Sequence, residues 1–159
     1  MISAPTQLRL PIDLPISRPL IPMKAAVVLL DRSEDEVLAL IDLGELTWAW
    51  DISSEAAERR EVRIWRESLL CHMQNDAGLR DSHAKLPEAS VLNFLLPHSG
   101  EEIRSTHLQR LFTASQGHIQ HLIDQKLLHG LNDPKTGRNG YVRVTRASFL
   151  AFMRSRRII

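Results

Sequence analysis

The feature that most constrains the fold of this chain of 159 residues is an internal repeat. A shift of 82 positions aligns Leu40-Ile41-Asp42 with Leu122-Ile123-Asp124, and a shift of 80 positions aligns Val62-Arg63-Ile64 with Val142-Arg143-Val144. The change of shift corresponds to a loop that is two residues longer in the first copy. Because the matched positions are mostly apolar or turn-forming, we predict one small fold that is used twice. Two unrelated amphipathic stretches are the alternative.

The second copy predicts the elements of one unit. Ser105 is a candidate cap for a helix over 106–112, and Ser115 for a second helix over 116–125, after a tight break. An extended segment, a stretch of turn-forming residues over 132–140, an alternating strand and a final helix follow. This order predicts an α+β fold that is mainly helical and carries small β-hairpins.

Here the pattern resembles a known family. The spacing Leu-x-x-Leu-Phe-x-x-Ser-x-x-x-Ile-x-x-Leu-Ile-x-x-x-x-Leu, a glycine-containing basic turn, Tyr-Val-Arg-Val and a closing Ser-Phe-Leu resemble winged helix-turn-helix proteins of the excisionase and MerR type over residues 105–154. The glycine that the family commonly has after its second helix is replaced near Lys126, whereas the first copy keeps Gly44. The resemblance implies two tandem winged units that bind DNA in transcriptional control or recombination.

Four segments follow from the repeat. We predict an extended Pro-rich arm over 1–22, a first winged-helix unit over 23–73, a polar linker over 74–93 and a second winged-helix unit over 94–159. The two units would act either as a built-in pseudo-dimer or as one DNA-binding unit with an assembly unit.

Charge distinguishes the two copies. Residues 1–80 carry 9 Lys/Arg and 13 Asp/Glu, whereas residues 81–159 carry 11 Lys/Arg and 6 Asp/Glu. The second helix of the first copy opens with Glu34-Asp35-Glu36, which would repel phosphates, at the positions of Gln116-Gly117-His118 in the second copy. We therefore predict that the second unit binds double-stranded DNA, and that the first is a scaffold or partner-binding unit.

The predicted DNA contacts lie opposite the inward stripe of Ile119, Leu122 and Ile123, because a recognition helix presents that face to the major groove. Gln and His side chains can read base edges, and basic side chains in a turn suit phosphates or the minor groove. In the first copy, Arg59, Arg60 and Arg63 are further candidates. The predicted contacts are Ser115, Gln116, Gly117, His118, Gln120, His121 and Lys126 around the second helix, Lys135, Thr136, Arg138 and Asn139 in the turn, and Arg104 and Arg110 at the first helix.

An interaction surface is predicted on the first copy. Strand alternation places Trp48 and Trp50 on one face, and the first helix is unusually apolar around Val27 and Val28. We interpret these residues as a contact for the other copy or for another subunit, with a plain core role for the tryptophans as the alternative.

Several classes of function are disfavoured. The single cysteine, Cys71, excludes an intramolecular disulfide and a Cys-rich zinc ribbon, and His118 and His121 lack a third metal ligand at obvious spacing. Neither a Walker-type loop nor a paired-carboxylate motif is present. We expect no enzyme, no metal and no cofactor. No apolar run reaches the roughly 18–20 residues of a membrane span, and the start does not resemble a secretory signal.

These observations favour a cytoplasmic, nucleoid-associated protein whose partner is double-stranded DNA, with self-association or a protein partner through the first unit. The alternative is a protein-interaction module of winged-helix fold without intrinsic DNA binding. The DNA target and the choice between transcription and recombination stay open.

Overall fold

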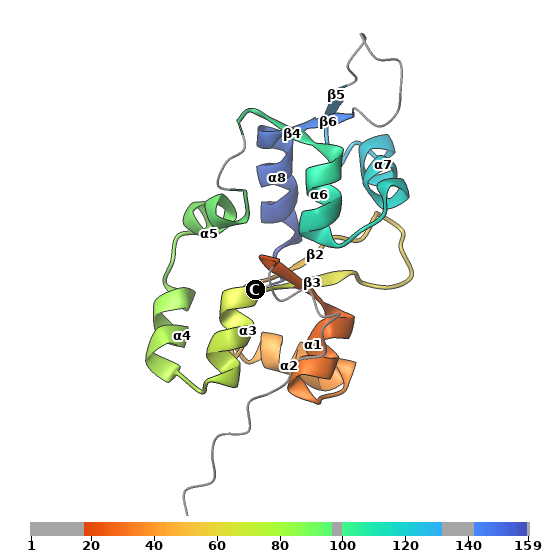
Figure 1. Cartoon of the computed structure of the whole chain (residues 1–159). Helices are drawn as coiled ribbons and strands as arrows, with labels where there is room; N and C mark the ends of the chain where they lie inside the picture. Colours follow the sequence, from red (N-terminus) through yellow and green to blue (C-terminus); the bar gives the residue numbers. More distant parts are fainter. Residues whose placement is uncertain (1–17, 97–99, 132–141, 159) are drawn as a thin grey trace, which may run out of the picture.

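The computed structural model describes residues 18–96, 100–131 and 142–158 (Figure 1). These residues form a mixed α/β structure with two small three-stranded antiparallel sheets and eight helices. The first sheet and its helices are β1 (Leu20–Pro22), α1 (Met23–Leu30), α2 (Glu34–Asp42), β2 (Ala49–Asp51), β3 (Val62–Trp65) and α3 (Arg66–Met73). After α4 (Ala77–Ala84) and α5 (Glu88–Leu95) come β4 (Glu102–Arg104), α6 (Ser105–Phe112), α7 (Gln116–Asp124), β5 (Gly130–Leu131), β6 (Arg143–Thr145) and α8 (Arg146–Arg156).

The order strand, helix, helix, strand, strand, helix occurs twice. The first sheet has the order β1-β3-β2 and the second β4-β6-β5. Ile21 lies opposite Ile64 in the first sheet and Ile103 opposite Val144 in the second, which are the positions that the shifts of 82 and 80 relate. The α+β class is therefore confirmed, and we call β1–α3 the first unit and β4–α8 the second unit.

Two segments differ from the sequence-based division. The stretch predicted as a linker contains α4 and most of α5, and Asp76 caps α4 by accepting a hydrogen bond from the Leu79 amide (2.9 Å). The last residues of the predicted arm form β1, which is an edge strand of the first sheet. An edge strand can contain Pro22 because no further strand needs a hydrogen bond from its free side. Both differences arise from short elements whose periodicity is too brief to read.

The second unit covers the face of the first sheet that is opposite to α1 and α2. Trp48, Trp50 and Trp65 belong to the same buried cluster as the core of α6, α7 and α8. The chain end adds to the edge of β2, because the Ile158 amide donates to the Ala49 carbonyl (2.9 Å). With both faces covered, every residue of β3 is buried, although strand side chains alternate between faces.

This packing is not reciprocal. The second sheet lies at the end of the molecule away from α1 and α2 (Figure 1). Glu102 and Thr145 occupy the positions of the buried Leu20 and Trp65, so the corresponding face of the second sheet is polar. The two units are therefore arranged head to tail and do not form a two-fold pseudo-dimer.

Candidate nucleic-acid interface

Helices α6 and α7 meet through a tight turn. Thr113 ends α6 in the left-handed conformation (φ 48°), and the Ser115 hydroxyl caps α7 by accepting from the His118 amide (3.1 Å). Ile119 and Leu122 are buried. The remaining predicted contacts on the opposite face are exposed, namely Ser115, Gln116, Gly117, Gln120 and His121.

One flank of α7 is covered by the loop between β2 and β3, which we call loop 52–61. The His118 ring Nε2 lies 2.7 Å from the carbonyl oxygen of Ile52, and His118 is half-buried. The Gln125 amide pairs with both backbone groups of Glu55, at 2.8 and 3.2 Å. The His118 side chain is therefore engaged by the first unit, and its contact with DNA stays a prediction.

The exposed surface of α6 is hollowed and cationic. A hollow of about 470 Å³ has Pro19, Leu95 and Leu111 in its lining. A neighbouring hollow of about 530 Å³ extends this surface to Thr113 and Ala114, at the α6–α7 turn. Among the described residues, no carboxylate lines either hollow. We use the name cationic hollow for this surface, whose basic side chains are Arg18, Arg104, His107 and Arg110.

Two members of the cationic hollow were not singled out in the sequence. The Arg18 guanidinium donates to the Arg110 carbonyl (3.3 Å) and to the Thr113 hydroxyl (3.0 Å), across 95 positions of sequence. His107 is exposed on the same helix as Arg110. Helical spacing from Arg110 would have suggested His107, whereas nothing local links Arg18 to α6.

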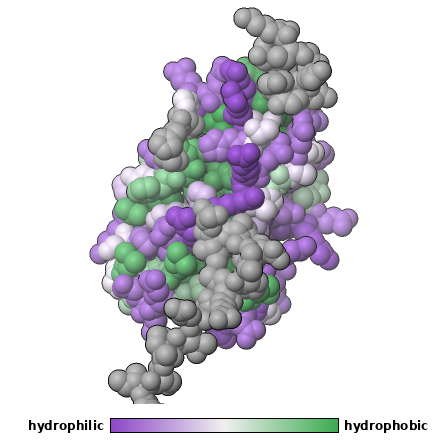
Figure 2. Space-filling model, in the orientation of Figure 1, coloured by the Kyte–Doolittle hydropathy of each residue, from purple (hydrophilic) through white to green (hydrophobic). Residues whose placement is uncertain are grey.

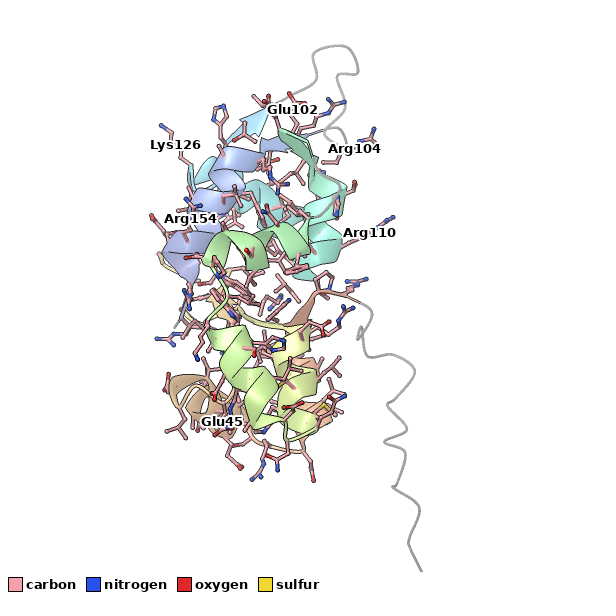
Figure 3. All side chains as sticks on the ribbon, turned by 90° about the vertical axis from the view of Figure 1, so that its left-hand side faces the viewer. Glu45, Glu102, Arg104, Arg110, Lys126 and Arg154 are labelled. Atoms are coloured by element: carbon pink, nitrogen blue, oxygen red, sulfur yellow. The ribbon has the colours of Figure 1, made fainter. Side chains whose placement is uncertain are left out.

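Lys126 lies on another side. Figure 3 shows Arg104 and Arg110 on one side of the second unit and Lys126 on the opposite side. Lys126 has φ 61° and occupies the position of Gly44 (φ 77°), so the residue that replaces glycine keeps the left-handed helix end. The predicted contacts Lys135, Thr136, Arg138 and Asn139 lie outside the described residues.

Arg63 does not face solvent. Its guanidinium donates to the carbonyl oxygens of Phe112 and Thr113 and so satisfies the carboxyl end of α6. Burial lowers the pKa of this guanidinium, and the neighbouring Glu61 carboxylate opposes that shift. Arg63 is 6% exposed, so the prediction that it reaches DNA is wrong.

Trp48 and Trp50 form part of the contact between the two units. Their rings stack with centroids 6.0 Å apart, and Arg157 lies 3.8 Å above the Trp48 ring. Both side chains are buried within the chain, so they are not a surface for another protein. Of the remaining predicted interaction residues, Val27 is half-buried and Val28 is exposed.

Metal-binding clusters and reactive thiols are not prominent among the described residues. Among the described residues, His, Cys, Asp and Glu form no group of three or more that could hold a metal ion. Cys71 is buried, and burial together with Asp76 raises the pKa of its thiol. Within the described part of the chain, no helix has the length and apolar composition that crossing a membrane requires.

Comparison with protein-family models, curated proteins and solved structures finds no match to this chain.

Proposed function

We propose that the chain is a non-enzymatic protein that binds double-stranded DNA through its second unit. The repeated order of elements supports the finer assignment of each unit as a winged helix-turn-helix. In this proposal α7 enters the major groove, where Gln116, Gln120 and His121 offer hydrogen-bonding groups to base edges. Gly117 adds no bulk to that face. Such binding is the activity of a transcription regulator or of an accessory factor in recombination.

The cationic hollow is the observation that carries the proposal. A helix in the major groove is flanked by the two phosphate backbones of the duplex. Arg104 and Arg110 lie on one side of the second unit and Lys126 on the other (Figure 3). Guanidinium groups suit phosphate oxygens because of their charge and fork geometry. The absence of carboxylates from the described lining of the cationic hollow removes a source of repulsion.

Among the described residues, α2 of the first unit begins with acidic side chains and offers no cationic surface equivalent to that of α6 and α7. Glu34, Asp35 and Glu36 are exposed at the start of α2. The pKa of the Glu36 carboxyl is lowered because the Ser33 amide and the Arg32 guanidinium donate hydrogen bonds to it, which keeps it ionised. Phosphates would be repelled there, so we assign the first unit the role of a scaffold for α6 and α7.

Fluorescence anisotropy with a labelled duplex at several salt concentrations tests the proposal. The wild-type chain should bind, with affinity that falls linearly on a log–log plot against salt. Arg104→Ala and Arg110→Ala should each reduce the salt slope by about 0.9, because each removes one phosphate contact. Lys85→Ala is the matched control, since Lys85 is exposed between α4 and α5, on the other side of the molecule from α7 (Figure 1).

Wild-type chain that does not bind duplex at low salt would overturn the proposal.

The second candidate is a protein-interaction module, and the exposure of Val28 (56%) and Leu43 (77%) on the first unit favours it. A stoichiometric protein partner that is lost in Leu43→Lys, with no DNA binding by the wild-type chain, would support this second function.

A further inference from the structure

We infer that loop 52–61 of the first unit is a second DNA-contacting arm beside α7, so that helix and loop from different units form one composite surface. This inference rests on the proposed function. It assigns DNA contacts to Arg59 and Arg60 of a unit whose own helix α2 begins with three acidic residues.

Loop 52–61 is closed at its base. The Ile52 amide donates to the Glu61 carbonyl (3.0 Å). The Asp51 carboxylate accepts from the amides of Ser53 (3.0 Å) and Glu61 (3.1 Å). Ala56 has φ 64°, a left-handed conformation that costs a non-glycine residue about 1 kcal/mol. Such a conformation persists where surrounding contacts determine it, so the loop has a defined shape.

Loop 52–61 is also attached to α7. The side-chain amide of Gln125 both accepts from and donates to the backbone of Glu55, which sets the position and the orientation of the loop together. His118 makes a third contact, to Ile52. In the first copy, Leu43 and Glu36 occupy the positions of Gln125 and His118. These three polar contacts therefore arise only from the surface chemistry of the second copy.

The charges of the loop are distributed unevenly. Arg59 and Arg60 are exposed, and within the described part of the chain neither forms an ion pair. Of the three carboxylates of the loop, Glu61 lies 3.4 Å from Arg63 while its side chain stays 51% exposed, and the Glu55 side chain is exposed although its backbone pairs with Gln125. Glu58 is exposed and has the opposite sign to its arginine neighbours.

The loop lies on the same side of the molecule as α7. It projects beyond the first sheet next to α7 (Figure 1), and hydrophilic side chains stand out at that edge in Figure 2. A duplex held by α7 would therefore pass along the loop. Exposed charges act on phosphates within a Debye length of about 8–10 Å, so the two arginines, Glu55 and Glu58 would all act on a duplex at this distance.

Opposite-sign variants test the inference. In the salt titration, the double variant R59A/R60A should reduce the salt slope by about 1.8 and weaken binding on the order of tenfold at physiological salt. Glu58→Ala should tighten binding roughly twofold, because it removes repulsion. Lys85→Ala should change neither quantity. All of these side chains are exposed, so the fold should be retained, and circular dichroism checks this.

Hydroxyl-radical footprinting separates the outcomes. Wild-type chain should protect a segment of backbone beside the groove that α7 occupies, and R59A/R60A should lose that protection while it keeps the central protection. If R59A/R60A and Glu58→Ala bind like wild type while Arg104→Ala weakens binding, the composite surface is overturned and the proposed function stands. If the wild-type chain does not bind duplex at low salt, both are overturned.

Discussion

Replacing Arg63 with methionine removes the guanidinium that joins β3 of the first unit to the end of α6 in the second. The guanidinium donates to the Phe112 and Thr113 carbonyls, to its neighbour Val62 (3.1 Å) and to the Glu61 carboxylate (3.4 Å). Methionine keeps the aliphatic stem and leaves two helix-end carbonyls without these donors.

The magnitude follows from these contacts. An unsatisfied buried acceptor costs about 1–3 kcal/mol, so the buried Phe112 carbonyl dominates the loss, and the part-buried Thr113 carbonyl adds less. The ion pair adds little, because the Glu61 side chain is 51% exposed and regains water. Methionine also removes the cost of burying a charge, which offsets part of the loss. The lowered pKa of Arg63 reflects the same cost, because burial disfavours the charged guanidinium. We expect a net loss of about 2–4 kcal/mol in the free energy of unfolding.

Urea unfolding and thermal melting followed by circular dichroism measure this loss. For a chain of this size, the expected loss lowers the melting temperature by roughly 5–15 °C. Arg32→Met is the matched control, because Arg32 also pairs with a glutamate but is 59% exposed, and it should cost under about 1 kcal/mol. Equal effects of the two variants, at an unchanged urea slope, would refute the assignment of Arg63 as the link between the units.

Three further predictions follow. Lys126→Gly should stabilise the chain by about 1 kcal/mol, because it relieves a left-handed conformation that Gly44 adopts without strain, yet it should weaken DNA binding; a lower melting temperature would contradict the first part. Burial raises the pKa of Asp51, but hydrogen bonds from Ser53 and Glu61 and the charge of Arg156 outweigh it, so the pKa lies below the ordinary 3.8. The stability that Asp51 contributes should be complete above the unfolded-state pKa of 3.8 and be lost as the pH falls through the lower folded-state pKa. The stability difference between wild type and Asp51→Asn should therefore be constant near neutral pH and shrink in acid. A difference that grows in acid would contradict this prediction. Cys71 should react slowly with a thiol reagent in the folded chain and completely in denaturant, since its thiol is buried and its pKa is raised; rapid labelling of native protein would show that the site opens.

The repeated order of elements and the course of α7 can be predicted from the amino-acid sequence alone. Ser115 marks the start of α7, and Ile119 and Leu122 mark its buried stripe, because capping and helical periodicity depend on residues only a few positions apart. Ser105, the other predicted cap, is instead the first residue of α6. The equivalence of the strand pairs β1–β3 and β4–β6 also follows, since the two shifts relate residues that occupy the same places in the strand pairing.

Which of the predicted site residues face outward depends on how the two units pack together. Sequence periodicity defines the side of α7 opposite Ile119, but it does not reveal that loop 52–61 covers the flank of His118. It also does not distinguish Arg63, which is buried in the contact between units, from Arg59, which is exposed. The same applies to Arg18, which lies 92 positions before Arg110.

The physical reason is that these contacts join segments distant in sequence, and their geometry depends on how one unit packs on the other. The inward residues of the two copies are similar. The face of the first sheet that the second unit covers is made by a few side chains such as Trp50 and Trp65, which have polar or smaller counterparts in the second copy. A local pattern therefore predicts each unit, and the head-to-tail packing of the units decides which surfaces remain available for binding.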